Sequence, residues 1–254
     1  MICAKNISFS YKTKSIFSRV SFSVFKGQIL TLLGPNGTGK TTLLKCLMGV
    51  YNVDSGKVFI GKNMIQSFSL KDLAKQISYV PQYFDNIGLS DFSVMEFIMM
   101  GRMPYVENTY SELDKDIVVE IVDEMKLTAL AFRNMRELSG GERQRVYIAR
   151  AIAQQPKAVL LDEPTSSLDL NNQLLVMHII ENLAKKKNIA IIMTMHDINL
   201  ASLFSDRIIL FKDKKLFKQG SVKDVITEEN IKAVYGVDTY VNYINGYPSV
   251  ALKR

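Results

Sequence analysis

The sequence predicts an α/β protein with a mostly parallel core sheet, an antiparallel β layer at the N-terminus and a helical insertion. Two patterns support this fold class. Short apolar runs that are typical of buried strands, such as ILTLL (29–33), alternate with helical patterns over most of the chain. Residues 2–9 and 20–25 instead alternate apolar and polar side chains, which is typical of half-exposed antiparallel strands.

The individual elements follow from the same patterns. Before residue 85 we expect strands at 2–9, 20–25, 29–33, 55–60 and 76–80 and a helix at 40–48. Apolar residues then recur every three to four positions, which predicts helices at 93–101 and 111–127, with Ser93 and Ser111 as N-caps. The alternation returns with helices at 142–154, 171–186 and 197–204 and strands at 158–162, 189–194 and 207–211.

These elements are expected to form one domain over residues 1–254. Its core and antiparallel layer would cover 1–85 and 134–220, and a helical subdomain would cover 86–133. A C-terminal extension at 221–254 is expected to hold a short helix at 227–235 and two weak strands.

Composition places few limits on function. Hydrophobic residues make up 47% of the chain and charged residues 22%, which is ordinary for a globular protein. The net charge of +7 permits an anionic partner, but the basic residues are spread out, and the run at 185–187 suits a helix end. Cys3 and Cys46 do not make a disulfide framework. The N-terminus resembles a strand and not a signal peptide, and no apolar run approaches about 18 residues, so another chain would have to cross any membrane.

A phosphate-binding loop is predicted at GPNGTGKT (34–41), which matches the pattern G-x-x-x-x-G-K-[ST]. Such glycines let backbone N–H groups surround a phosphate at the start of a helix. Lys40 can reach the β- and γ-phosphates, and the Thr41 hydroxyl can bind Mg²⁺. The alternative is a chance glycine-rich turn, but the match lies between a predicted strand and a predicted helix, as the mechanism requires. The expected nucleotide-binding residues here are Gly34, Pro35, Asn36, Gly37, Thr38, Gly39, Lys40, Thr41 and Thr42.

Two carboxylates follow the apolar run in AVLLDEP (158–164). The carboxyl ends of parallel strands are where ligands of α/β proteins bind. Asp162 can hold the Mg²⁺ shell through water, and Glu163 can polarise an attacking water. The alternative is an acidic turn before Pro164.

A second glycine-rich helix start lies at LSGGE (138–142). Ser139 and Glu142 have the spacing of a capping box. That box does not account for Gly140 and Gly141, because each glycine lowers helix stability by about 1 kcal/mol. The glycines make sense if an anion approaches the backbone closely. Since 34–41 already holds the chain's own phosphates, the anion is expected to belong to another molecule.

Together with Gln82 in YVPQ and His196 in TMHD, these motifs resemble those of ABC-type ATPases over nearly the whole chain. The resemblance implies ATP and Mg²⁺ as cofactors. Tyr11 would stack on adenine, although a surface strand tyrosine is the alternative because Phe9 is close. Gln82 would reach Mg²⁺ and the attacking water, Asp169 of SSLD would lie at a dimer seam, and His196 would contact the γ-phosphate. Lys40, Gln82, Glu163 and His196 are therefore the expected catalytic residues, and Thr41, Gln82 and Asp162 the expected metal ligands.

The resemblance also implies partners. Ser139, Gly140, Gly141 and Glu142 would face the nucleotide of a second copy, so that two chains enclose two ATP molecules. Two transmembrane permease subunits would contact the chain at the cytoplasmic face of the inner membrane, and an extracytoplasmic substrate-binding protein would act indirectly. An exporter motor is the alternative, and it is disfavoured because we expect no membrane domain on this chain and because some of its segments resemble those of importers. ABC ATPases that act on nucleic acid in repair carry a long coiled coil between the phosphate-binding loop and the LSGGE motif. Here only 99 positions separate Lys40 from Ser139, so no nucleic-acid partner is expected.

Softer motifs resemble the importer branch for iron–siderophore, haem and cobalamin, which also includes molybdate or tungstate importers. They are FIMMGRMPY (97–105) with Gly101, Arg102 and Pro104, MHDINLA (195–201) and VKDVITEENIKAVYGV (222–237). A generic helical insertion is the alternative. In this branch a coupling helix of the membrane chain docks between Gln82 and Pro104, so an exposed apolar patch is expected around Phe92, Met95 and Met99.

The two histidines are expected to differ in role. His196 follows an apolar strand, which places it at the same sheet edge as Gly34 and Asp162. His178 lies within the apolar helical stretch LLVMHIIENL, so we expect it to be a packing residue away from the site.

Overall fold

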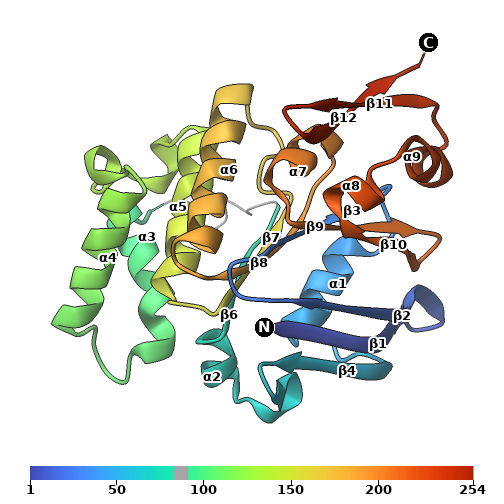
Figure 1. The fold of residues 1–254 in the computed structure, drawn as a ribbon. Coiled ribbons are helices and arrows are strands. Elements are labelled where there is room, and N and C mark those ends of the chain that lie inside the picture. The colour runs from blue at the N-terminus through green and yellow to red at the C-terminus, as the bar shows by residue number, and fades with distance from the viewer. Residues whose placement is uncertain (83–90, 254) are drawn as a thin grey trace.

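A six-stranded sheet lies at the centre of the protein in the computed structural model, which describes residues 1–82 and 91–253 (Figure 1). The strand order is β10-β9-β3-β8-β7-β6, and all but β10 run parallel. The predicted α/β class with a mostly parallel core sheet is confirmed. The strands are β3 (Ile29–Leu33), β6 (Ile77–Val80), β7 (Ala158–Asp162), β8 (Ala190–Thr194), β9 (Arg207–Lys212) and β10 (Lys215–Ser221).

The middle strands are buried on both faces of this sheet. In β3, Ile29 and Leu33 belong to one apolar core, and Leu30 and Leu32 belong to a second core on the opposite face. A strand covered on both sides needs a continuous apolar run, which explains why these strands do not alternate. The first core includes residues of α5 (Gly140–Ala153), α6 (Leu170–Lys185) and α7 (Ile198–Phe204), and the second includes residues of α1 (Lys40–Leu47).

An antiparallel sheet of order β2-β1-β4-β5 covers the α1 face, as predicted. Its second strand begins at Lys14, earlier than the expected strand at 20–25. The pairing of β1 with β2 contains register shifts, and Lys12 and Arg19 have positive φ angles. These irregularities break the simple alternation, so the sequence pattern shows only the regular end of the strand. The four strands are β1 (Ile2–Tyr11), β2 (Lys14–Val24), β4 (Ser55–Ile60) and β5 (Asn63–Met64).

The helical insertion lies to one side of the central sheet (Figure 1). It contains α3 (Val94–Met99) and α4 (Glu112–Glu124), and both begin at the expected N-caps, Ser93 and Ser111, each of which forms a capping box. The predicted helix at 93–101 continues as a 3₁₀ turn over Met100–Tyr105, which contains Pro104. A further short helix, α2 (Leu70–Ala74), precedes β6 and was not predicted.

A buried ion pair holds this insertion together. Arg102 Nε donates to Asp114 Oδ1 at 2.8 Å, and the two side chains are only 3% and 7% exposed. Arg102 also donates to the carbonyl of Ala153 at 2.7 Å, which attaches the 3₁₀ turn to the end of α5. The Asp114 carboxylate additionally closes the capping box of α4.

The C-terminal extension forms two short helices and a hairpin above the sheet (Figure 1). The helix expected at 227–235 is α9 (Glu228–Tyr235), and the two weak strands are β11 (Thr239–Ile244) and β12 (Tyr247–Leu252). α8 (Val222–Val225) precedes them. Within the described residues, no helix has both the length and the apolar character needed to span a membrane.

Candidate nucleotide-binding site

The phosphate-binding loop connects β3 to α1, as its sequence predicts. Two of its glycines are required by their surroundings. Gly34 has a φ of 148°, and a Cβ there would lie 2.5 Å from the carbonyl oxygen of Phe211. Gly39 is the N-cap of α1 with a φ of 99°, and a Cβ there would lie 2.8 Å from Ile16 Cγ2. The loop therefore lies directly against β2 and β9, with its backbone free to surround an anion.

Lys40 is folded back into this loop. Its ammonium donates to the carbonyls of Gly34 at 2.7 Å and Pro35 at 3.1 Å, and the residue is only 6% exposed. Burial lowers the pKa of Lys40, while the nearby carboxylates of Glu163 and Asp162 act in the opposite direction. The buried ammonium and the loop at the start of α1 together form a positive centre suited to phosphate.

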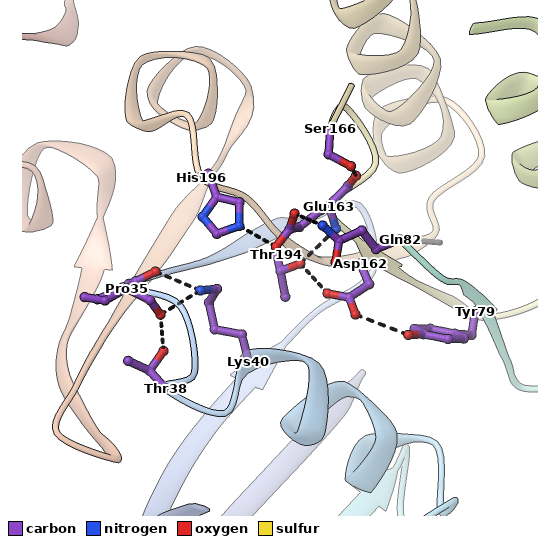
Figure 2. A network of polar contacts seen from close by, with 11 residues as sticks. Pro35, Thr38, Lys40, Tyr79, Gln82, Asp162, Glu163, Ser166, Thr194 and His196 are labelled. Carbon is purple, nitrogen blue, oxygen red and sulfur yellow. Dashed lines mark hydrogen bonds and ion pairs between the residues drawn. The ribbon is translucent and has the colours of Figure 1, made fainter. Parts of the chain in front are cut away.

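Asp162 ends β7 and is fixed by two hydroxyl groups. The Thr194 hydroxyl donates to Asp162 Oδ1 at 2.6 Å, and the Tyr79 hydroxyl donates to Oδ2 at 3.3 Å (Figure 2). Thr194 lies opposite Asp162 in the register of β7 and β8, and both residues are buried. Burial, followed by the Asp162 charge, raises the pKa of Tyr79 far above its ordinary value, so this hydroxyl remains a donor.

Glu163 stands at the sheet edge in a left-handed backbone conformation, with a φ of 49°. The Thr194 hydroxyl accepts its N–H at 2.9 Å, and its carbonyl accepts from the Ser166 N–H at 3.1 Å and hydroxyl at 3.0 Å. The carboxylate contacts the Gln82 amide and the His196 ring, one on each oxygen (Figure 2). Glu163 is thus held through its backbone, while its side chain joins Gln82 to His196.

A cavity of about 350 Å³ brings together nine of the predicted site residues. Lys40, Gln82, Glu163 and His196, the four expected catalytic residues, all line it. The remaining lining residues are Ile16, Asn36, Gly37, Gly39, Thr41 and Thr42. Gly34, Pro35, Thr38 and Asp162 are adjacent in sequence but do not line it.

The oxygen atoms at this cavity fit a magnesium ion that arrives with a nucleotide. No group of three or more His, Cys, Asp or Glu side chains in the described part of the chain could hold a metal. Mg²⁺, however, is usually bound by one or two protein groups together with water and substrate phosphates. Thr41 and Gln82 both line the cavity, and the amide nitrogen of Gln82 contacts Glu163. Asp162 stands beside them at the end of β7.

The LSGGE segment starts α5 outside this cavity. Ser139 accepts the N–H of Glu142 at 3.3 Å, and the Glu142 carboxylate accepts the N–H of Ser139 at 2.8 Å, as the capping box predicts. These hydrogen bonds lower the pKa of Glu142. No residue of LSGGE lines the cavity. Within one chain, the LSGGE segment and the phosphate-binding loop therefore remain separate.

The two glycines of this segment differ in their surroundings. A Cβ on Gly141 would lie 2.4 Å from Asn172 Oδ1, and the Asn172 amide is tied to the Asp169 carboxylate at 3.0 Å. Packing within the chain therefore accounts for Gly141. A Cβ on Gly140 would meet only Leu168 Cδ2 at 3.9 Å among the described residues. Packing within this part of the chain therefore does not require a glycine at position 140.

Three predicted features differ in part from the structure. Tyr11 is 42% exposed and packs edge-on against Phe9 and Tyr51, outside the cavity, so its contact with adenine stays a prediction.

The prediction of His178 as a packing residue is wrong. Its side chain is 61% exposed, and its Nδ1 lies 3.4 Å from Glu181, because this position falls on the solvent-facing side of α6.

The apolar patch at Phe92, Met95 and Met99 is half-buried against the core and so is less exposed than expected. Part of the expected docking segment, residues 83–90, lies outside the described residues.

Sequence analysis missed several side chains that build the site. Thr194 and Tyr79 orient the Asp162 carboxylate, Ser166 donates to the Glu163 carbonyl, and Ile16 lines the cavity. A buried threonine facing Asp162 across parallel strands is predictable only once the strand register is known. Ile16 lies in the irregular part of β2, where the sequence carries no signal for the phosphate-binding loop.

Comparison with known proteins places the chain among proteins with the same motifs. The ABC transporter family model matches residues 17–166. A probable iron chelatin transport ATP-binding protein of Helicobacter pylori is 37% identical over 236 residues, covering 91% of each chain. The structure is also similar to an inward-facing ABC transporter assigned to the metal-chelate type, with a TM-score of 0.87 at 30% identity over 100% of this chain and 97% of the other. A dimeric ATP-binding cassette with bound ADP and Pi has a TM-score of 0.76 at 27% identity, covering 87% of this chain and 98% of the other.

Proposed function

Because this chain belongs to the ABC transporter family and is an ATPase, we propose that it is the ATP-hydrolysing motor subunit of an importer. Its cargo is a metal chelate of the iron–siderophore, haem or cobalamin type, or an oxyanion such as molybdate. The observation that carries the proposal is the convergence of Lys40, Gln82, Glu163 and His196 on one cavity behind a phosphate-binding loop.

The side chains around the cavity divide the chemistry among them. Lys40 and the backbone of 34–41 hold the β- and γ-phosphates, and Thr41 with Gln82 and Asp162 holds Mg²⁺, which neutralises phosphate charge when bound. Glu163 accepts a proton from the attacking water, and its contact with Gln82 and His196 sets the direction of its oxygens. His196 contacts the γ-phosphate from the opposite wall. Tyr11 stacks on adenine at the exposed end of β1.

A second copy of the chain completes each site. The exposed start of α5 at Ser139 and Gly140 offers backbone N–H groups at a helix N-terminus, which attract phosphate. Gly140 supports this assignment because a side chain there would fit against the described residues, so packing does not explain the glycine. In a two-fold dimer, Ser139 to Glu142 and Asp169 of one chain meet the nucleotide bound by the other chain.

The helical insertion and the neighbouring helix α2 of the core are the proposed contact with two membrane permease subunits. A groove of about 310 Å³ lies beside α2 and is lined by apolar and polar side chains of the core, Tyr79 and Arg150 among them. Leu70 at its rim is 86% exposed, and Met103 in the adjacent 3₁₀ turn is 64% exposed. Exposed apolar residues around a groove suit a docked helix, and Phe92, Met95 and Met99 extend the same insertion.

The cargo class is supported by two kinds of observation. The Gly-Arg-x-Pro segment forms a structured turn, since Arg102 is buried and paired with Asp114. The relatives described as serving iron chelatin and metal chelates are similar over nearly the whole chain. The importer would place the chain peripherally at the cytoplasmic face of the inner membrane, with an extracytoplasmic binding protein acting through the permeases.

Substitution Glu163→Gln tests the hydrolytic assignment. The amide keeps the shape of the side chain but cannot accept the proton, so kcat should fall by at least about 100-fold while ATP binding persists. ATP should then trap a dimer, visible by light scattering. Undiminished hydrolysis would exclude Glu163 as the general base. Asp169→Asn is a useful comparison, since it alters the seam without removing the base.

A mixing experiment tests the shared site. A heterodimer of a Ser139→Arg chain with a Lys40→Ala chain has one site with both lesions and one with neither, if Ser139 acts on the nucleotide of the other chain. About half of the wild-type turnover is then expected if the sites work independently. Loss of all activity, equal to that of each homodimer, would contradict the exchange of residues between chains.

A further inference from the structure

The first turn of α7 is tied to the C-terminal hairpin by one side chain. Asn199 Oδ1 accepts the N–H of Val250 at 2.7 Å, and Asn199 Nδ2 donates to the carbonyl of Val250 at 3.2 Å. An asparagine side chain carries one acceptor and one donor group, so it can pair with both backbone groups of a strand residue, as a neighbouring strand would. Asn199 therefore closes the outer edge of β12.

The other strand of the hairpin, β11, is held at the residue that faces Val250. Val241 of β11 faces Val250 in the strand register, and its N–H donates to the Glu228 carboxylate of α9 at 3.2 Å. Both valines also pack against the apolar core of the protein. The hairpin is thus fixed between α7 and α9, and it cannot shift without breaking contacts on both edges.

This attachment lies next to the switch histidine. His196 directly precedes Asp197, the N-cap of α7, and Asn199 follows three positions after His196. α7 has seven residues, so holding its first turn also holds the loop that carries the ring. Figure 2 shows that ring facing Glu163, and 45% of it is exposed. The ring is thus held by Glu163 at its tip and by the start of α7 through its backbone.

We propose that Asn199 is a positioning residue for His196, through which the hairpin β11–β12 sets the place of the switch histidine. The proposal rests on the role of His196 in the proposed function. It gives the C-terminal extension a part in ATP hydrolysis although the extension contributes no residue to the wall of the cavity.

The two histidines of the chain provide a direct readout. With ¹³C-labelled histidine, the nucleotide-free protein should give two Cε1–Hε1 signals, which His178→Gln assigns. His178 contacts Phe204, the last residue of α7, with ring centroids 5.2 Å apart, whereas His196 precedes the first residue. The two signals therefore report on opposite ends of the same helix.

The test compares Asn199→Ala with Asn242→Ala, which changes an exposed asparagine on the same hairpin. Asn199→Ala should shift or broaden the His196 signal and leave the His178 signal in place. The kcat for ATP should fall by about three- to tenfold with KM within about twofold, as expected from the loss of one or two hydrogen bonds. Asn199→Asp keeps the acceptor for the Val250 N–H and should give an intermediate result, and Asn242→Ala should change neither signal nor rate.

Each other outcome has a defined meaning. An unchanged His196 signal in Asn199→Ala, or equal shifts of both histidine signals, would overturn the positioning role. A shifted His196 signal with unchanged turnover would keep the positioning role but contradict the hydrolytic role of His196 in the proposed function. If Asn199→Ala fails to fold, Asn199→Asp provides the same comparison.

Discussion

Thr194 offers the sharpest test of how the two carboxylates are held. Substitution Thr194→Val keeps the shape of a buried β-branched side chain and removes only the hydroxyl group. That hydroxyl donates to Asp162 Oδ1 at 2.6 Å and accepts the N–H of Glu163 at 2.9 Å. Thr194→Ser is the matched control, because it keeps the hydroxyl and removes a methyl group.

The magnitude follows from the two hydrogen bonds. A hydrogen bond to a charged group contributes about 1.5–3 kcal/mol, and a buried N–H left without an acceptor costs about 1–3 kcal/mol. Since Thr194 is 0% exposed, water cannot replace either partner. We expect Thr194→Val to lower the free energy of unfolding by about 3–5 kcal/mol. Thr194→Ser should cost about 1 kcal/mol for the lost methyl group.

Urea and thermal unfolding measure this difference, and ATP turnover measures its effect on the site. For a chain of this size, the expected fall in Tm is roughly 6–20 °C for the valine variant and 2–4 °C for the serine variant. The kcat should drop at least about tenfold in Thr194→Val, because the Glu163 backbone at a φ of 49° loses the acceptor for its N–H. Equal stabilities of the two variants would refute the hydrogen-bond argument.

Two further predictions concern the helical insertion and the start of α5. Asp114→Ala should lower the free energy of unfolding by about 3–5 kcal/mol in urea titrations, because it leaves Arg102 buried and unpaired. Asp72→Ala, at the corresponding third position of the exposed helix α2, should cost about 1 kcal/mol, and equal losses would contradict the argument. Gly140→Ala should leave thermal stability unchanged or raise it by up to about 1 kcal/mol, while ATP turnover falls. Gly141→Ala should instead destabilise the chain, and a loss of stability in Gly140→Ala would contradict the distinction between the two glycines.

The pattern of buried strands and loops made the core of this fold predictable. β3, β7 and β8 are each buried throughout and largely apolar, and each ends at a residue of the site or directly before it. A parallel sheet aligns those ends at one edge, so the convergence of Lys40, Glu163 and His196 follows from strand order alone. The N-caps at Ser93 and Ser111 were predictable because they depend only on the residues at the start of each helix.

The errors arose where position depends on contacts between distant segments. β10 is an edge strand with few buried residues, so KLFKQGS shows no strong alternation. For His178, the apolar stretch LLVMHIIENL suggested a buried position, yet Leu174, one turn before His178, is itself exposed. The buried face of α6 instead carries Val176, Met177, Ile180, Leu183 and Ala184. Apolar residues occur on two faces of this helix, so the local sequence does not decide which face is buried. The contact of α6 with the rest of the core decides it.

The contact between Gly141 and Asn172 has a consequence for timing in a dimer. Asn172 is held by Asp169, and Asp169 ends the short turn that begins at Glu163, whose carbonyl accepts from Ser166. The segment that would bind the other chain's phosphate is thus joined, through a few adjacent contacts, to the proposed general base of its own chain. In a closed pair, this path would allow phosphate release at one site to alter when the other site next hydrolyses ATP.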